Sequence, residues 1–239
     1  MEQGPPPPHK RRIRPNMVAT VATGALVVGL LAIAVSRQDR EPDTPTYPLR
    51  EDITTTVFWV GEAADSSNAY IHNRASTWRE NWMSDYGGFD NPKERCDFMP
   101  CEFTPNENPF YFALPYNDLD GTCKAKESQR QIPWYENGVP RGQSLVKNRW
   151  IEVRYEGKVA YAQWQDAGPF GEDDTAYVFG GTTPQADAGL DISPSTASYL
   201  GLGGRGQTDW RFVTEDAVPP GPWRKVVTST PPDCAEQSS

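Results

Sequence analysis

A run of nineteen residues without a charged side chain, Met17–Val35, constrains this chain more than any other feature. A helix rises about 1.5 Å per residue, so a helix of this length just crosses a hydrocarbon core of about 30 Å. Four basic residues precede the run, whereas the residues after it carry mixed charges. This asymmetry predicts that the N-terminus stays in the cytoplasm and that the rest of the chain lies outside.

The same run contains Ala32-Ile33-Ala34, which has the small-x-small pattern of a signal-peptidase site. Cleavage after Ala34 would release the protein, but we favour an anchor because the run is longer than the apolar core of about 7 to 15 residues in signal peptides. The chain is therefore expected at the cell membrane as a single-pass protein. We expect a cytoplasmic basic tail (1–16), a transmembrane signal-anchor in the lipid bilayer (17–35), a proline-rich linker (36–52), a folded domain (53–218) and a C-terminal tail (219–239).

The four cysteines form an even set in a domain that is sent to an oxidising compartment, which predicts two disulfides. Three pairings are open. We favour Cys96 with Cys101, which closes a short loop, and Cys123 with Cys234, which ties the tail to the domain. A zinc site is the weaker interpretation, because the chain has no Cys-x-x-Cys pair and only two histidines. We therefore expect no metal.

Composition indicates a folded, mainly β domain. Eight tryptophans, ten tyrosines and nine phenylalanines supply apolar surface, and 23 prolines with 20 glycines favour short strands joined by turns. The formal net charge of −9 disfavours nucleic-acid binding, because phosphates need a basic surface. The sequence has neither a GxGxxG motif nor a P-loop, so no cofactor is expected.

Local patterns predict five strands and two short helices. The clearest is a hairpin whose arms alternate apolar and polar residues around a Glu-Gly turn. A helix in RASTWRENWM and a helix capped by Ser193 with Pro194 in its first turn are also expected. The rest of residues 61–108 is expected to be a loop-rich insertion, and the sequence leaves the roles of 61–108 and 120–148 open. The tail after Pro219 is expected to run irregularly up to Cys234. The expected strands are 54–60, 110–114, 149–155, 158–165 and 208–213.

Three segments resemble the double-psi β-barrel of rare lipoprotein A and its relatives. They are WIEVRYEGKVAYAQWQDAGPF at 150–170, GLDISPSTASYLGL at 189–202 and, more faintly, FALP at 112–115. The resemblance implies a six-stranded double-psi β-barrel with short helices. Its members include septal lytic transglycosylases, family 45 endoglucanases and non-hydrolytic expansins, so it implies a cell-wall polysaccharide partner, peptidoglycan or β-glucan, more than one reaction.

The resemblance also implies roles for two aspartates. Asp166 matches the aspartate of the Asp-x-Gly-Pro-Phe turn that carries the chemistry in the rare lipoprotein A group. Asp191 matches the proton donor of the endoglucanases. The catalytic histidine of the first group has no match, and Tyr111 falls near its position. Asp118 follows a predicted strand and is a third candidate, because an inverting glycosidase needs two carboxyls about 6.5 to 9.5 Å apart.

Each of these aspartates also has a purely structural interpretation. Asp118 suits a polar turn, Asp166 could fix the Gly-Pro turn, and Asp191 lies near a helix N-terminus. The acidic run 172–174 could bind Ca²⁺ together with Asp166, but we favour a solvated turn.

Four further residues are candidates for substrate binding. Tyr116 and Asn117 follow a predicted strand, where polar residues often line sites, and Tyr111 lies just before them. Trp134 could stack on a sugar, together with Tyr135, Trp164 and Trp210. Core packing is the alternative for these rings, and we favour it for Trp164.

Two functional hypotheses follow. In the first, the domain is a membrane-tethered hydrolase or lytic enzyme that acts on cell-wall polysaccharide with Asp166 and either Asp191 or Asp118 as acid and base. In the second, it is a non-catalytic wall-binding, structural or protein-interaction module that keeps the barrel without a complete catalytic pair, as the missing histidine suggests.

Overall fold

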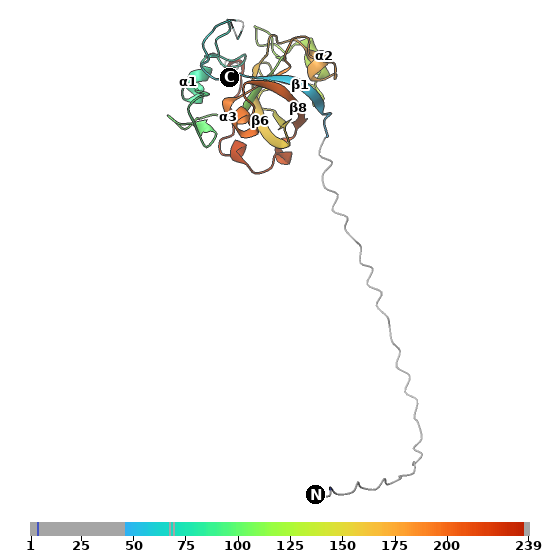
Figure 1. Ribbon diagram of the computed structural model, residues 1–239. Coiled ribbons are helices and arrows are strands. Elements are labelled where there is room, and N and C mark those ends of the chain that lie inside the picture. Colours follow the sequence, from blue (N-terminus) through green and yellow to red (C-terminus); the bar gives the residue numbers. More distant parts are fainter. Residues whose placement is uncertain (1–3, 5–45, 67, 69, 237–239) are drawn as a thin grey trace, which may run out of the picture. The chain divides into compact units, whose positions relative to one another are not determined.

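The computed structural model describes residue 4 and residues 46–66, 68 and 70–236 (Figure 1). The predicted segment 17–35 lies outside these residues, as does most of the predicted linker. Within the described part of the chain, no helix combines the length and the apolar character needed to cross a membrane. The described residues from 46 onward belong to one compact unit.

Six strands close into a barrel in the order β1-β7-β4-β6-β5-β8. The pairs β1–β7 and β4–β6 are parallel, and the other four pairs are antiparallel. The fold is therefore mainly β, and its few helices are short and lie around the barrel (Figure 1). The barrel strands are β1 (Arg50–Val57), β4 (Tyr111–Leu114), β5 (Trp150–Tyr155), β6 (Lys158–Ala167), β7 (Leu190–Ile192) and β8 (Arg205–Val213).

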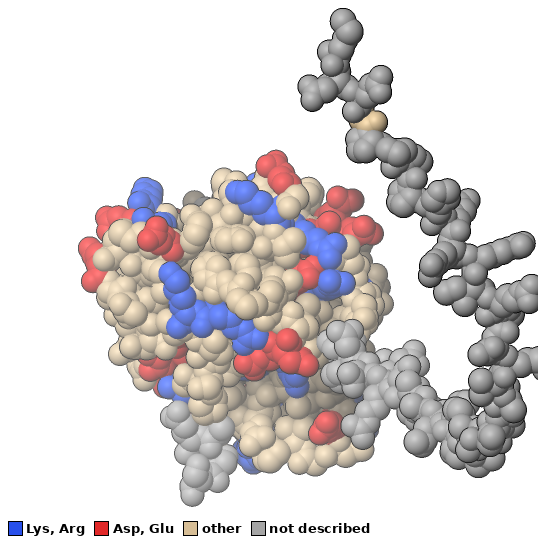
Figure 2. Space-filling model, turned by 90° about the horizontal axis from the view of Figure 1, so that it is seen from below, with Lys and Arg blue, Asp and Glu red and all other residues tan. Residues whose placement is uncertain are grey.

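The remaining elements decorate this barrel. Strands β2 (Arg95–Cys96) and β3 (Met99–Pro100) form a separate two-stranded sheet. The helices are α1 (Trp82–Tyr86), α2 (Thr175–Val178), α3 (Pro194–Leu200) and α4 (Asp233–Glu236), with 3₁₀ turns at Glu127–Gln131, Glu215–Ala217 and Pro222–Arg224. Figure 2 shows a face on which acidic and basic side chains are interspersed among uncharged ones.

The strongest local predictions are confirmed. The hairpin forms as β5 and β6 in the expected register. The Ser193 side chain caps α3, Pro194 is its first residue, and Gly201 ends it in the left-handed conformation. Both expected disulfides, Cys96–Cys101 and Cys123–Cys234, are present.

The helix predicted within RASTWRENWM is wrong over most of its length, because α1 begins only at Trp82. The preceding backbone bonds to distant groups instead: the Thr77 amide donates to Asp166 and the Glu80 amide donates to Asp233. A helix starting at residue 77 would pull these two amides away from their acceptors. Long-range hydrogen bonds have thus replaced local helical ones.

The C-terminal tail is not irregular up to Cys234, as we had expected. Trp223 is only 4% exposed, and its ring packs against Phe110, Tyr161 and Tyr199. Buried Asn108 also donates to the Trp223 carbonyl at 3.1 Å. The tail is therefore part of the core, because burying the large apolar surface of Trp223 away from water is favourable in free energy.

Replacing Trp223 with alanine is expected to lower the free energy of unfolding by about 3 to 5 kcal/mol, because a large core side chain is lost. Urea denaturation at equilibrium measures this change. Val227 lies in the same tail and is 38% exposed, so Val227→Ala is the matched control and should change stability by less than about 0.5 kcal/mol. Equal effects of the two substitutions would contradict a packed tail.

Candidate functional site

Four residues form a row across neighbouring strands of the barrel. Thr56 of β1 pairs with Asp191 of β7, Asp191 pairs with Ala113 of β4, and Ala113 pairs with Asp166 of β6. Directly paired residues project to the same side of a sheet, so all four side chains share one side. Ala113 has the smallest side chain of the four and lies between the strands that carry the two aspartates.

A β-bulge in β6 brings Asp166 into this row. Phe112 pairs with Trp164, but the next residue, Ala113, pairs with Asp166, so Gln165 is the extra residue. Trp164 belongs to the main hydrophobic core. In a regular strand Asp166, two residues later, would project to the same side as Trp164. The bulge reverses this and turns Asp166 towards the side of Asp191, as bulges beside functional sites often do.

Buried polar contacts hold the bulge in place. Gln165 is almost fully buried, and its Oε1 accepts a hydrogen bond from Lys147 Nζ at 2.9 Å. Its Nε2 donates to Asn148 Oδ1 at 3.0 Å. Because buried polar groups are costly when unpaired, these bonds fix the side on which Gln165 lies and with it the orientation of Asp166.

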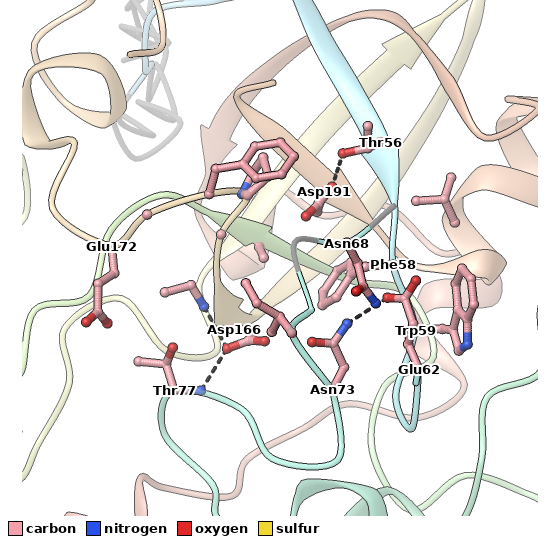
Figure 3. Close-up of a pocket in the computed structure, with 18 of the residues that line it drawn as sticks. Thr56, Phe58, Trp59, Glu62, Asn68, Asn73, Thr77, Asp166, Glu172 and Asp191 are labelled. Carbon is pink, nitrogen blue, oxygen red and sulfur yellow. Dashed lines mark hydrogen bonds between the residues drawn. The ribbon is translucent and has the colours of Figure 1, made fainter. Parts of the chain in front are cut away.

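The row lines a cavity of about 470 Å³ (Figure 3). Two loops complete its walls: the segment after β1 and the turn after β6, which contains the cis peptide Gly168–Pro169. This volume is within the usual range for small-ligand sites. The lining residues with polar side chains are Thr56, Trp59, Glu62, Asn68, Asn73, Thr77, Asp166, Glu172 and Asp191.

Asp166 is 8% exposed, and its Oδ1 accepts hydrogen bonds from the backbone amides of Thr77 at 2.7 Å and Ala167 at 2.8 Å. Burial raises the pKa of Asp166 to about 7; these hydrogen bonds counteract the rise, and the nearby Asp191 carboxylate adds to it. The Asp166 carboxyl can therefore carry a proton near neutral pH, as a general acid must.

Asp191 lies across the cavity from Asp166 and accepts a hydrogen bond from the Thr56 hydroxyl (Figure 3). Burial raises the pKa of Asp191 to about 6, and the bond from Thr56 opposes this rise. Asp166 and Asp191 thus both titrate well above the usual range of an aspartate. Two carboxyls with raised pKa values in one cavity are typical of sites that transfer protons.

Glu62 is a third carboxyl in the cavity, and the sequence analysis missed it. It is 7% exposed, and its Oε2 accepts a hydrogen bond from Asn73 Nδ2 at 2.8 Å. Two backbone hydrogen bonds, from Gly61 to Asn73 and from Asn73 to Glu62, fix the loop around it. Burial raises the pKa of Glu62 to about 7, and Asp191 contributes to the rise. No motif marks Glu62, because its role depends on how the loop folds back.

Apolar side chains surround the acids. Ile71 and Phe170 line the cavity although they are 53% and 51% exposed, and Trp59 is half-buried beside them. Among the described residues that line this cavity, none is lysine, arginine or histidine. The site therefore combines flat apolar surfaces and amides with acids only, which suits an uncharged ligand better than an anion.

Asp118, the third predicted acid, does not line this cavity. It is fully buried, and its carboxylate accepts hydrogen bonds from Ser144 Oγ at 2.7 Å, the Leu145 amide at 2.6 Å and Gln129 Nε2 at 3.1 Å. Burial raises its pKa, and these three bonds oppose the rise. Its contacts hold the loop 127–145 against the barrel, so they match the structural interpretation.

The four predicted substrate-binding residues also lie away from the cavity. Buried Tyr111 donates its hydroxyl to Asp90 at 2.8 Å, and buried Tyr116 packs in the main core. Asn117 accepts a hydrogen bond from Trp78 Nε1 at 3.0 Å. Trp134 packs against the core and donates to a backbone carbonyl at 2.8 Å. Trp164 is in the core, as expected.

The three residues of the acidic run 172–174 have three different environments. Glu172 lines the cavity, Asp173 pairs with Lys126 at 2.7 Å, and Asp174 caps α2. Within the described ranges, no group of three or more potential metal ligands comes together.

Comparisons with known proteins leave the function to be inferred from this site. No protein-family model and no curated protein matches the chain. Among solved structures, the chain is similar to the Streptomyces papain inhibitor (SPI), with 14% identity and a TM-score of 0.29 over 72% of this chain and 99% of that chain. A TM-score this low does not establish a shared fold, and function resides in the site rather than the fold.

The raised pKa of Asp166 predicts a pH-dependent stability. A folded pKa of about 7 against the ordinary 3.8 means that the folded protein binds more protons than the unfolded chain between these values. The contribution of protonated Asp166 to the stability of the folded protein is fully present below about pH 4 and is lost as the pH rises through 7. Between these pH values Asp166 should lower the free energy of unfolding of the wild type by on the order of 2 to 4 kcal/mol, and Asp166→Asn should abolish this decrease. Urea unfolding at several pH values measures it. Exposed Asp187→Asn is the control, and an unchanged slope in Asp166→Asn would contradict the prediction.

Proposed function

We propose that this domain is a double-psi β-barrel that hydrolyses glycosidic bonds of a cell-wall polysaccharide, peptidoglycan or β-glucan, with Asp166 and Asp191 as its acid and base. The observation that carries the proposal is the placement of both carboxyls on either side of Ala113 in one open cavity. Six strands that include two parallel pairs in a mixed barrel support the double-psi arrangement.

The strand geometry favours an inverting reaction. Asp166 and Asp191 are on the two strands that flank β4, so their Cα atoms are separated by two strand spacings, about 10 Å. Side chains that converge on one cavity from this separation fit the carboxyl distance of about 6.5 to 9.5 Å in inverting enzymes better than the about 5 to 5.5 Å in retaining ones. The additional distance accommodates the attacking water.

We assign the acid role to Asp166, because its pKa of about 7 lets the carboxyl hold a proton near neutral pH and give it to the leaving-group oxygen. This exchanges the roles implied by the resemblance to the endoglucanases, in which Asp191 is the donor. Asp191 would then take a proton from water as that water attacks the anomeric carbon. Glu62 lines the same cavity, and the Asp191 carboxylate contributes to its raised pKa.

The remaining lining residues suit a sugar. The Asn68 and Asn73 amides can hydrogen-bond to hydroxyls, and exposed Phe170 offers a flat ring for stacking on a sugar face. The two disulfides support a location outside the cytoplasm, because disulfides form readily in an oxidising compartment. Tethering by the uncharged run 17–35 is proposed from the sequence.

A non-catalytic wall-binding or structural module remains the second candidate function. The observation that favours it is that Asp166 and Asp191 both make hydrogen bonds within the protein, to the Thr77 and Ala167 amides and to Thr56. Carboxyls that only fix loops would make the same contacts. Turnover separates the two candidates.

Incubating residues 36–239 with purified sacculi and with soluble β-glucans should release muropeptides or short glucans, detected by mass spectrometry. Asp166→Asn and Asp191→Asn should each lower the rate by about 10²- to 10⁴-fold, because each removes a group that transfers a proton. Asp187→Asn should keep the full rate. If the folded protein releases no product from any of these polymers but still binds them, it is a binding module.

Phe170→Ala should weaken the binding of a neutral oligosaccharide by about 3- to 10-fold, because a stacking ring is lost without loss of core packing. Isothermal titration calorimetry measures this effect. Val159→Ala, at another exposed apolar position, is the matched control and should bind normally. A polyuronate should not bind, because the described residues that line the site include acids but no lysine, arginine or histidine. Tight polyuronate binding would contradict the proposed substrate class.

A further inference from the structure

The C-terminal segment holds the cavity wall that contacts Asp166. The Cys123–Cys234 disulfide fixes this segment to the loop after β4. Immediately before Cys234, Asp233 contacts three consecutive residues, 78–80, which directly follow Thr77. The connection joins residues more than 150 positions apart in the sequence, and neither the proposed chemistry nor the barrel requires it.

The contacts between these segments are numerous and directional. The Asp233 amide donates to the Trp78 carbonyl at 2.9 Å, and the Glu80 amide donates to Asp233 Oδ2 at 2.6 Å. Arg79 Nη1 pairs with Asp233 Oδ1 at 2.7 Å and also donates to the Pro231 carbonyl at 3.3 Å. Each residue from 78 to 80 therefore has a bond to the C-terminal segment.

The next residue along this wall is Thr77, whose amide donates to Asp166 Oδ1 at 2.7 Å. We propose that Asp233 is a positioning residue for Asp166: the disulfide-anchored C-terminal segment holds residues 78–80 so that the Thr77 amide points at the Asp166 carboxylate. This proposal deepens the proposed function, since Asp166 is the acid of that site. It concerns the orientation of one carboxyl, so it can be tested without turnover.

The hydrogen bond from Thr77 to Asp166 also has an electrostatic consequence. The Thr77 hydrogen bonds lower the pKa of Asp166, against the rise caused by burial and by Asp191. The Ala167 amide at 2.8 Å also stabilises the charged carboxylate, whereas Glu62 and Asp191, which line the same cavity, do not. Loss of the Thr77 contact should therefore raise the pKa of Asp166 further.

The test is an NMR titration of the Asp166 carboxyl carbon in the full chain, in wild type and in Asp233→Asn. The substitution removes the charge that pairs with Arg79 and weakens the acceptor for the Glu80 amide. We expect the Asp166 pKa to rise by about half a unit or more. The Thr77 amide shift should follow the titration of Asp166 in wild type and lose that dependence in the variant.

Glu215→Gln is the matched control, because it removes a surface ion pair, that with Arg224 at 3.2 Å, outside the cavity. It should leave the Asp166 titration unchanged. Asp233→Glu keeps the charge but shifts the carboxylate, and it should give a smaller change in the same direction; it also serves if Asp233→Asn does not fold. An Asp166 titration that is identical in wild type and in the folded Asp233 variants overturns the proposal. A shifted Asp166 titration in the Asp233 variants, together with no glycan cleavage by the wild type, would count against the proposed function alone.

Discussion

The single extra residue in β6 is the constraint on which the candidate site depends. Without the bulge at Gln165, Asp166 would project from the same face of β6 as Trp164. Its carboxylate would then be buried in the main core. With the bulge, Asp166 and Asp191 face each other over Ala113. The sheet register therefore sets the separation of the two acids, and rigid strands hold a separation more precisely than loops do.

Burying three carboxyls beside one another opposes stability, because each must either lose its charge or keep it away from water. The protein retains Glu62, Asp166 and Asp191 in this arrangement without a lysine, arginine or histidine among the described residues that line the cavity. By contrast, buried Asp90 is paired with Arg95. A group of buried acids without a cationic side chain beside it is the pattern expected when stability is given up for proton transfer. The compensating bonds come from amides and hydroxyls, which orient the carboxyls without neutralising them.

The parts of the fold that sequence patterns predicted are those with local causes. Strand alternation predicted the β5–β6 hairpin, and a serine cap followed by proline predicted α3. The parts that were missed depend on distant partners. Residues 77–80 do not form a helix because Asp166 and Asp233 bind their amides, and Glu62 enters the site only because its loop folds back on Asn73. Asp166 and Asp191 were predicted from motif resemblance, but that they face the same cavity follows from a bulge that no local pattern marks.

The proposed chemistry requires Asp166 and Asp191 to interact as one pair of acids. Carboxyl carbon titration by NMR in wild type and in Asp191→Asn tests this directly. We expect a wild-type Asp166 pKa of about 7 that falls when the Asp191 charge is removed, because Asp191 contributes to the rise. An Asp166 pKa near the ordinary 3.8, or one that Asp191→Asn leaves unchanged, would contradict a coupled pair and with it the proposed chemistry.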